Sequence, residues 1–200
     1  MPKAFLLICF FLKTLTSLVF AQAGDSLLNI HEQTFYSLQS ALINPNQVYK
    51  LKLRNEKLTV FPEEIFLFKN LRELDLSKNK IREIPPEIVK LTRLELLDLS
   101  KNQIEAFIRE ICFLPELKVL RMSRNNLISI PSEIENLHAL EVLDLWDNDL
   151  TGFPESLSKL EKLKVFDLRG ILINSKEQKR IEEILPDTKI YFSPSCNCGF

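Results

Sequence analysis

The sequence predicts an α/β solenoid of about six repeats, each 23 residues long, with a parallel sheet on its concave side. Two observations predict this fold. The first is a leucine that recurs every 23 residues, at Leu71, Leu94, Leu117, Leu140 and Leu163. The second is that the first four of these leucines begin segments such as LRELDLSKNKI, which share one apolar pattern with asparagine at the ninth place. Four consecutive copies of one pattern make the period specific.

Each repeat is expected to contribute one short strand. The two leucines of a Leu-x-Leu step, such as Leu74 and Leu76, point to the same side because side chains alternate along a strand. Equal positions of successive repeats then stack into columns about 4.8 Å apart. The asparagine column consists of Asn79, Asn102, Asn125 and Asn148. We expect its amides to bind backbone groups that the inward turn leaves unpaired.

The second half of each repeat is expected to close the coil with a helical segment. Apolar residues such as Ile88, Leu91 and Leu94 recur there at helical spacing. Proline precedes four of these segments, where it fits a first helical turn. The prolines are Pro62, Pro85, Pro131 and Pro154.

Atypical segments are expected at both ends of the array, which spans residues 48–185. In residues 24–47, apolar residues from Phe35 to Leu42 are spaced for one face of a capping helix that ends before Pro45. At the other end, Ser175 and Gln178 resemble a capping box that opens a helix to about Leu185. Residues 186–200 then supply a seventh, capping strand and a tail with two cysteines.

The first residues, 1–23, are typical of a signal peptide. An apolar run follows Lys3, and Ala21-Gln22-Ala23 has the form of a signal-peptidase site. We expect cleavage after Ala23 and export, with a retained membrane anchor as the alternative. Lys13 interrupts the run, which is shorter than the roughly 18 apolar residues of a membrane span.

Neither a cofactor, a metal nor catalysis is expected. The chain has two histidines and four glycines, and it contains no metal-ligand, phosphate-binding or nucleophile motif. Cys112 is predicted to be a partly buried thiol. Cys196 and Cys198 could be free, form a disulfide or bind metal, although two sulfurs fall short of the four ligands of structural zinc. The net charge of −1 argues against nucleic acid as a partner.

The solvent-facing side of the sheet is the candidate binding surface. One of its columns changes from polar to aliphatic along the array, and a second contains serines and then the single tryptophan. Aspartates between the buried leucines, such as Asp75 and Asp98, are interpreted as solvated rather than catalytic. We predict that a protein partner with a basic rim and an apolar centre binds the C-terminal half of this surface. Its predicted residues are Leu96, Val119, Arg121, Val142, Asp144, Trp146, Val165, Asp167 and Arg169.

The repeated pattern L-x-x-L-x-L-x-x-N-x-L is that of leucine-rich repeats. Together with the I-P-x-E-I-x-x-L half-repeats at Ile84–Leu91 and Ile130–Leu137, the segments Ala41–Leu53 and Ile181–Phe192 resemble short exported leucine-rich-repeat proteins of the leptospiral type. The resemblance implies a binding role at the bacterial surface or outside the cell, towards host proteins among others, and no catalytic residues. The repeats alone also resemble intracellular Ras-suppressor-type scaffolds. A structural module linked through the two tail cysteines is a further alternative. No small-molecule substrate is expected. Association with a membrane is expected only if the leader is retained.

Overall fold

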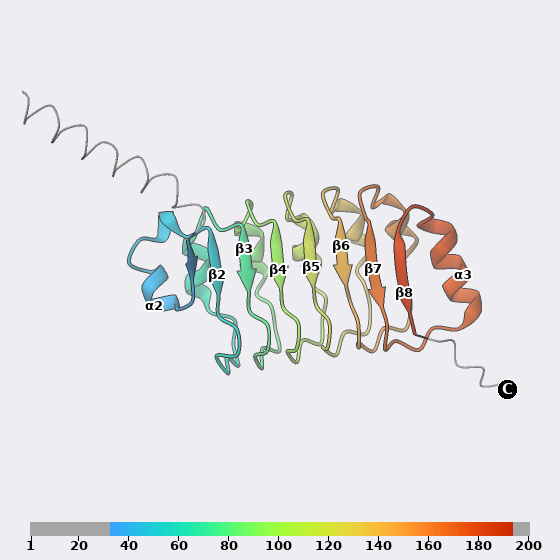
Figure 1. The fold of residues 1–200 in the computed structure, drawn as a ribbon, viewed down its shortest axis with the longest axis horizontal. Coiled ribbons are helices and arrows are strands. Elements are labelled where there is room, and N and C mark those ends of the chain that lie inside the picture. The colour runs from blue at the N-terminus through green and yellow to red at the C-terminus, as the bar shows by residue number, and fades with distance from the viewer. Residues whose placement is uncertain (1–32, 194–200) are drawn as a thin grey trace, which may run out of the picture. The chain divides into compact units, whose positions relative to one another are not determined.

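The computed structural model describes residues 33–193, which form one parallel sheet whose strands follow each other in chain order from β1 to β8 (Figure 1). The predicted α/β solenoid is therefore confirmed. The strands are β1 Thr34–Phe35, β2 Lys50–Lys52, β3 Glu73–Asp75, β4 Leu96–Asp98, β5 Val119–Arg121, β6 Val142–Asp144, β7 Val165–Leu168 and β8 Lys189–Phe192. The chain divides into two units at Gln33, and this fold belongs to the second. The predicted signal peptide and the cysteine tail lie outside the described residues.

The register of the sheet repeats the sequence period. Leu74 pairs with Leu97, and Leu97 lies in line with Leu120 of the next strand. All three are fully buried, so equal leucines stack into one continuous core behind the sheet. Each middle repeat is covered by a neighbouring repeat on both of its stacking sides.

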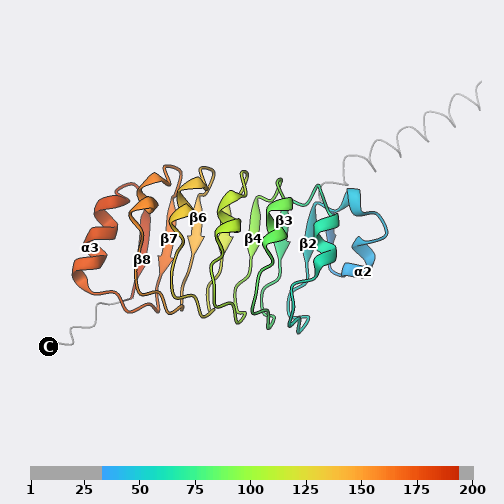
Figure 2. The ribbon, with the colours of Figure 1, turned by 180° about the vertical axis from the view of Figure 1, so that it is seen from behind.

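Short helices return the chain on the side opposite the sheet (Figure 2). They are η3 Glu63–Leu67, η4 Pro86–Lys90, η5 Arg109–Phe113, η6 Ser132–Asn136 and η7 Glu155–Lys159, all of the 3₁₀ type. The apolar residues Ile88, Leu91 and Leu94 are three apart, which suits the three residues per turn of this helix. Backbone amides bond three residues back along the same series, from Leu91 to Ile88 and from Leu94 to Leu91, each at 3.0 Å. Among residues 33–193, no helix is long and apolar enough to span a bilayer.

The N-terminal cap differs from the predicted helix. Phe35 lies in strand β1, where it pairs with Leu51, and only Leu38–Ala41 is α-helical, as helix α2. A 3₁₀ turn, η2 Pro45–Gln47, follows. Ser37 is extended and caps α2, so the backbone changes direction between Phe35 and Leu38. A strand of two residues is too short to show alternation in sequence, and for this reason the sheet has one strand more than predicted.

The C-terminal cap consists of helix α3, Ser175–Ile184, and strand β8, which pairs with β7. The predicted capping box at Ser175 is wrong. Asn174 is the N-cap, and its side chain accepts a hydrogen bond from the amide of Glu177 at 3.0 Å. The amide group of Gln178 instead donates to the carbonyl of Ile173 at 3.0 Å.

The asparagine column links neighbouring repeats. The side-chain amide of Asn102 donates to the carbonyl of Leu99 in its own repeat at 2.8 Å and to that of Leu76 in the preceding repeat at 3.0 Å. Its oxygen accepts from the amide of Ile81 at 3.1 Å. Asn79, Asn125 and Asn148 repeat this arrangement, and all four side chains are buried.

The residue before each asparagine has a left-handed backbone conformation. Lys78, Lys101, Arg124 and Asp147 have φ between 57° and 59°, and Gly170 occupies the same column with φ of 75°. A residue with a side chain pays about 1 kcal/mol for this conformation, whereas glycine adopts it freely.

Candidate functional site

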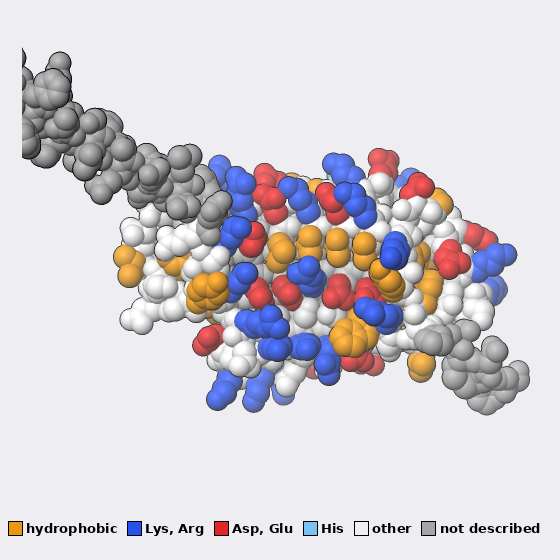
Figure 3. Space-filling view, viewed as in Figure 1, with side chains coloured by type: hydrophobic (Ala, Val, Ile, Leu, Met, Phe, Trp, Pro, Cys, Tyr) orange, Lys and Arg blue, Asp and Glu red, His pale blue; other side chains and the backbone are white. Residues whose placement is uncertain are grey.

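An aliphatic stripe runs across the solvent side of the sheet, which we call the sheet face. Leu96 pairs with Val119, Val119 with Val142, and Val142 with Val165, so the four side chains lie in one row (Figure 3). All four are partly exposed. Four apolar side chains in a row on a solvated face form a surface that a partner could cover.

One border of the sheet face is neutralised by ion pairs within the chain. Lys118 lies 2.6 Å from Glu95, and Lys164 lies 2.6 Å from Glu141. Arg72 reaches Glu95 from the other side at 3.4 Å. We call these residues the paired border.

The row on the other side of the stripe consists of Asp75, Asp98, Arg121, Asp144 and Asp167. Each aspartate accepts a hydrogen bond from the backbone amide two residues later, at 2.9 Å for Asp75 and Asp98, 3.2 Å for Asp144 and 3.1 Å for Asp167. The aspartates therefore stabilise the turn after each strand. Two are also ion-paired, Asp98 with Arg121 at 3.9 Å and Asp167 with Arg169 at 2.5 Å.

Asp144, unlike Asp98 and Asp167, makes no ion pair with any residue in 33–193. It accepts the hydroxyl of Ser123 at 2.8 Å, and the hydroxyl of Ser100 lies 3.1 Å from that of Ser123. Burial raises the pKa of the Asp144 carboxyl, and the nearby Asp167 adds to the rise, while the bonds from Ser123 and Trp146 and the charge of Arg121 oppose it. A cationic group from a partner would stabilise the charged form of this carboxylate.

The serine column is not solvent-facing as predicted. Ser77, Ser100 and Ser123 are only 4 to 8% exposed. Small side chains stacked at the repeat spacing cover one another, so a position that projects from the sheet edge becomes buried. The hydroxyl of Ser77 has no hydrogen-bond partner among the residues that the structure describes.

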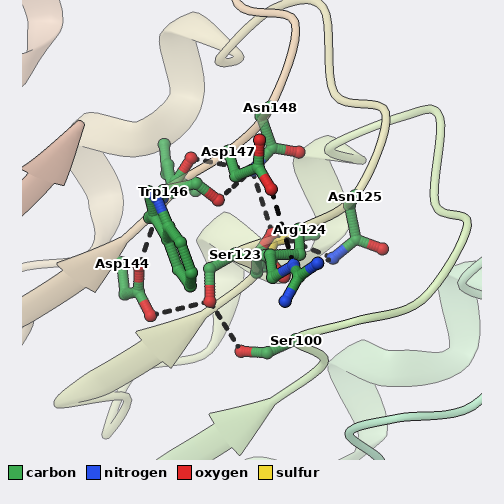
Figure 4. A network of polar contacts seen from close by, with 10 residues as sticks. Ser100, Ser123, Arg124, Asn125, Asp144, Trp146, Asp147 and Asn148 are labelled. Carbon is green, nitrogen blue, oxygen red and sulfur yellow. Dashed lines mark hydrogen bonds and ion pairs between the residues drawn. The ribbon is translucent and has the colours of Figure 1, made fainter. Parts of the chain in front are cut away.

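Trp146 takes the place of serine in this column and is partly buried rather than fully exposed. The guanidinium carbon of Arg124 lies 5.6 Å from the centre of its ring, and Arg124 is held in turn by Asp147 at 3.4 Å. Figure 4 shows the indole beside Ser123, between Asp144 and Arg124. Arg124 thus contacts the ring, and Asp144 accepts a hydrogen bond from the backbone amide of Trp146.

The sequence analysis missed Tyr191 and Arg124. Tyr191 pairs with Asp167, and its ring lies 5.4 Å from the guanidinium of Arg169 and 4.9 Å from the ammonium of Lys189. Tyr191 lies between Ile190 and Phe192 of the predicted capping strand, and this alternation is the sequence signal for an outward side chain at position 191. The structure thus brings Asp144, Trp146, Asp167, Arg169 and Tyr191 to the C-terminal end of the sheet face.

The remaining candidate groups are metal ligands, Cys112 and a hollow near His138. No group of three or more histidine, cysteine or acidic side chains there could hold a metal ion. Cys112 is fully buried rather than partly buried, and burial, with smaller contributions from Glu133 and Glu110, raises the pKa of its thiol to about 12. A hollow of about 470 Å³ near His138 is lined by two glutamates and two lysines and lies away from the sheet face.

Comparisons with known proteins agree with this arrangement. The profile of the family described as Leucine rich repeat matches residues 46–104 and 109–173. A leucine-rich-repeat protein of Leptospira interrogans is 32% identical, with a TM-score of 0.59, over 74% of this chain and 44% of its own. The plant peptide hormone receptor RGFR1, solved in complex with RGF2, is 32% identical, with a TM-score of 0.61, over 71% of this chain and 24% of its own.

Internalin C2 of Listeria monocytogenes has the same fold at 22% identity, with a TM-score of 0.66, over 76% of this chain and 64% of its own. The chain thus spans less than half the length of the Leptospira protein and of the plant receptor. No curated protein matches it significantly.

Proposed function

The chain belongs to the leucine-rich-repeat family, and from that premise we propose that it is an exported, non-enzymatic module that binds a protein partner through the C-terminal half of its sheet face. The leader in residues 1–23 supports export. The resemblance to leptospiral proteins of this type supports a role at the bacterial surface or outside the cell.

The observation that carries the proposal is the position of Trp146 on the sheet face, where the row of Asp144 and Asp167 separates it from the aliphatic stripe. Its ring is held by Arg124 before any partner arrives, and no hydrogen bond of its indole N–H is found within residues 33–193. Tryptophan is the residue type most often found at the energetic centre of interfaces. A ring that is already ordered loses less entropy on binding than a mobile one.

Charge supports the same half of the sheet. The glutamates of the paired border already have cations within the chain, whereas Asp144 makes no ion pair with any residue in 33–193, so an arginine or lysine of the partner could pair with it beside the indole. A related fold offers a precedent for a polypeptide ligand, since the plant receptor is solved with a peptide hormone.

The proposal is tested by Trp146→Ala in a pull-down of host and bacterial surface proteins, followed by measurement of the affinity for the captured partner. We expect a loss of about 2 kcal/mol or more in binding free energy, the scale of an anchoring aromatic. The fold should remain, because the ring projects away from the buried Leu143 and Leu145.

Ser77→Ala is the matched control, since it changes the same column in the N-terminal half. It should leave both affinity and circular dichroism unchanged, because the Ser77 hydroxyl has no partner among the described residues. Unchanged affinity of a folded Trp146→Ala protein would refute the anchor and redirect attention to the helical side.

A further inference from the structure

Six exposed basic side chains lie in the turns that follow strands β2 to β5. We call them the basic ridge: Arg54, Lys57, Lys78, Lys80, Lys101 and Arg124. Figure 3 shows blue side chains gathered along this edge, below the N-terminal half of the sheet face. None of these residues was part of the predicted site.

Backbone hydrogen bonds hold the ridge in register from one turn to the next. The amide of Lys78 donates to the carbonyl of Ser100, beside Lys101, and the amide of Lys101 donates to that of Ser123, beside Arg124, both at 2.8 Å. The charges therefore recur at the strand spacing of about 4.8 Å on a fixed backbone.

Most of these charges are not neutralised within the chain. Among residues 33–193, the ridge makes one ion pair, between Arg124 and Asp147 at 3.4 Å. The acidic groups closest in sequence are Glu56 in the first of these turns, Glu83 after Lys80, and the row of Asp75 and Asp98. Each of these two aspartates already accepts a hydrogen bond from a backbone amide. The paired border on the opposite side shows that this fold can neutralise exposed lysines when glutamates are placed opposite them.

The C-terminal end of the ridge contacts apolar surface, and this favours a polypeptide over other polyanions. Arg124 belongs to the ridge and also contacts the ring of Trp146, and the row of Asp98 and Asp144 separates both from the aliphatic stripe. A nucleic acid or a sulfated polysaccharide would supply anions but leave the valines uncovered. A polypeptide can supply carboxylates and apolar side chains together.

We propose that the basic ridge binds an extended acidic segment of a protein partner, with its carboxylates along Arg54 to Arg124 and apolar side chains towards the stripe. The turns after β2 and β5 are three strand spacings apart, about 14 Å, which four to five extended residues span. This surface shares Arg124 and the stripe with the proposed binding site, but its basic residues from Arg54 to Lys101 lie outside that site, so the proposal stands even if Trp146 is not an anchor.

The test is fluorescence anisotropy of a labelled peptide, Glu-Glu-Val-Glu-Glu-Val-Glu-Glu, with the full chain, against the same peptide with glutamine in place of glutamate. We expect binding of the acidic peptide only, weakened at least about ten-fold when sodium chloride rises from about 50 to about 500 mM. The double variant K78G/K101G should bind at least about five-fold more weakly.

Glycine was chosen because both lysines are left-handed, so K78G/K101G removes charge while favouring the native backbone. If the melting temperature of K78G/K101G is no lower than that of the parent, the weaker binding does not come from unfolding. The matched control is K118Q/K164Q, which removes two lysines from the paired border and should change the affinity less than two-fold.

Three results would overturn the proposal: no binding of the acidic peptide, equal loss in K118Q/K164Q, or no loss in K78G/K101G. A heparin octasaccharide is tested in parallel as the alternative ligand. Tighter binding of this sulfated sugar than of the peptide, sensitive to K78G/K101G, would assign the ridge to a glycan and reject the acidic segment. Trp146→Ala should leave peptide binding within two-fold, which separates this test from that of the proposed function.

Discussion

At the scale of single residues, the asparagines hold successive repeats together. Asn102 donates to carbonyls of two repeats and accepts one amide, and it is buried, so water cannot replace it. We predict that Asn102→Ala lowers the free energy of unfolding by about 1 to 3 kcal/mol, because it leaves buried backbone groups unpaired. Urea denaturation measures the loss.

Glu56 is the natural control for Asn102, because it occupies the same column in the first repeat but is exposed. Glu56→Ala should change the stability by less than about 0.5 kcal/mol, as surface substitutions usually do. Equal losses in the two variants would show that the side-chain amide is not what holds the turn.

Single residues also show where sequence reasoning ends. The asparagine column could be predicted from the period alone, because every repeat offers the same backbone groups. The burial of Ser77, Ser100 and Ser123 could not, since it depends on how closely equal turns stack. The contact between Arg124 and Trp146 joins different columns of neighbouring repeats, and a column-by-column comparison of the sequence does not bring such residues together.

At the scale of elements, helix α3 closes the C-terminal end of the core. Its only buried residue is Ile181, and Arg180 fixes it to the last repeat by donating to the carbonyl of Phe153 at 2.6 Å and pairing with Glu155. Asn174 is the N-cap of this helix, and its side chain accepts a hydrogen bond from the amide of Glu177. The end of the array is therefore held by a few polar contacts as well as by packing.

We predict that Asn174→Ala costs about 1 kcal/mol, the usual effect of losing an N-cap, whereas Ser175→Ala costs almost nothing. Thermal unfolding followed by far-ultraviolet circular dichroism decides between them. A larger loss for Ser175→Ala would restore the capping box that the sequence suggested.

The 3₁₀ helices and strand β1 differ in how far the sequence predicts them. The i, i+3, i+6 spacing of Ile88, Leu91 and Leu94 already distinguishes a three-residue turn from the mixed spacing of an α-helix. This distinction was readable from the sequence, whereas strand β1 was not, because two residues carry no period.

At the scale of the whole molecule, the fold is one-dimensional, so stability depends on each repeat and on its two neighbours. Strands β1 and β8 each have a neighbour on one side only. Cys112 lies in η5, near the middle, and is fully buried. We expect the ends to open more readily than the centre, which makes this thiol a reporter of unfolding of the central repeats.

We predict that iodoacetamide at about pH 8 modifies Cys112 far more slowly than it modifies glutathione. Burial excludes the reagent, and a thiol with its pKa raised to about 12 stays protonated at that pH. Peptide mapping by mass spectrometry assigns the modification to Cys112. Leu97→Ala, at a fully buried position of the same repeat, should cost about 2 to 5 kcal/mol and speed the reaction about thirty-fold or more, whereas the exposed Thr92→Ala should not. Modification of the parent protein at the rate of glutathione would mean that the central repeats open independently of their neighbours.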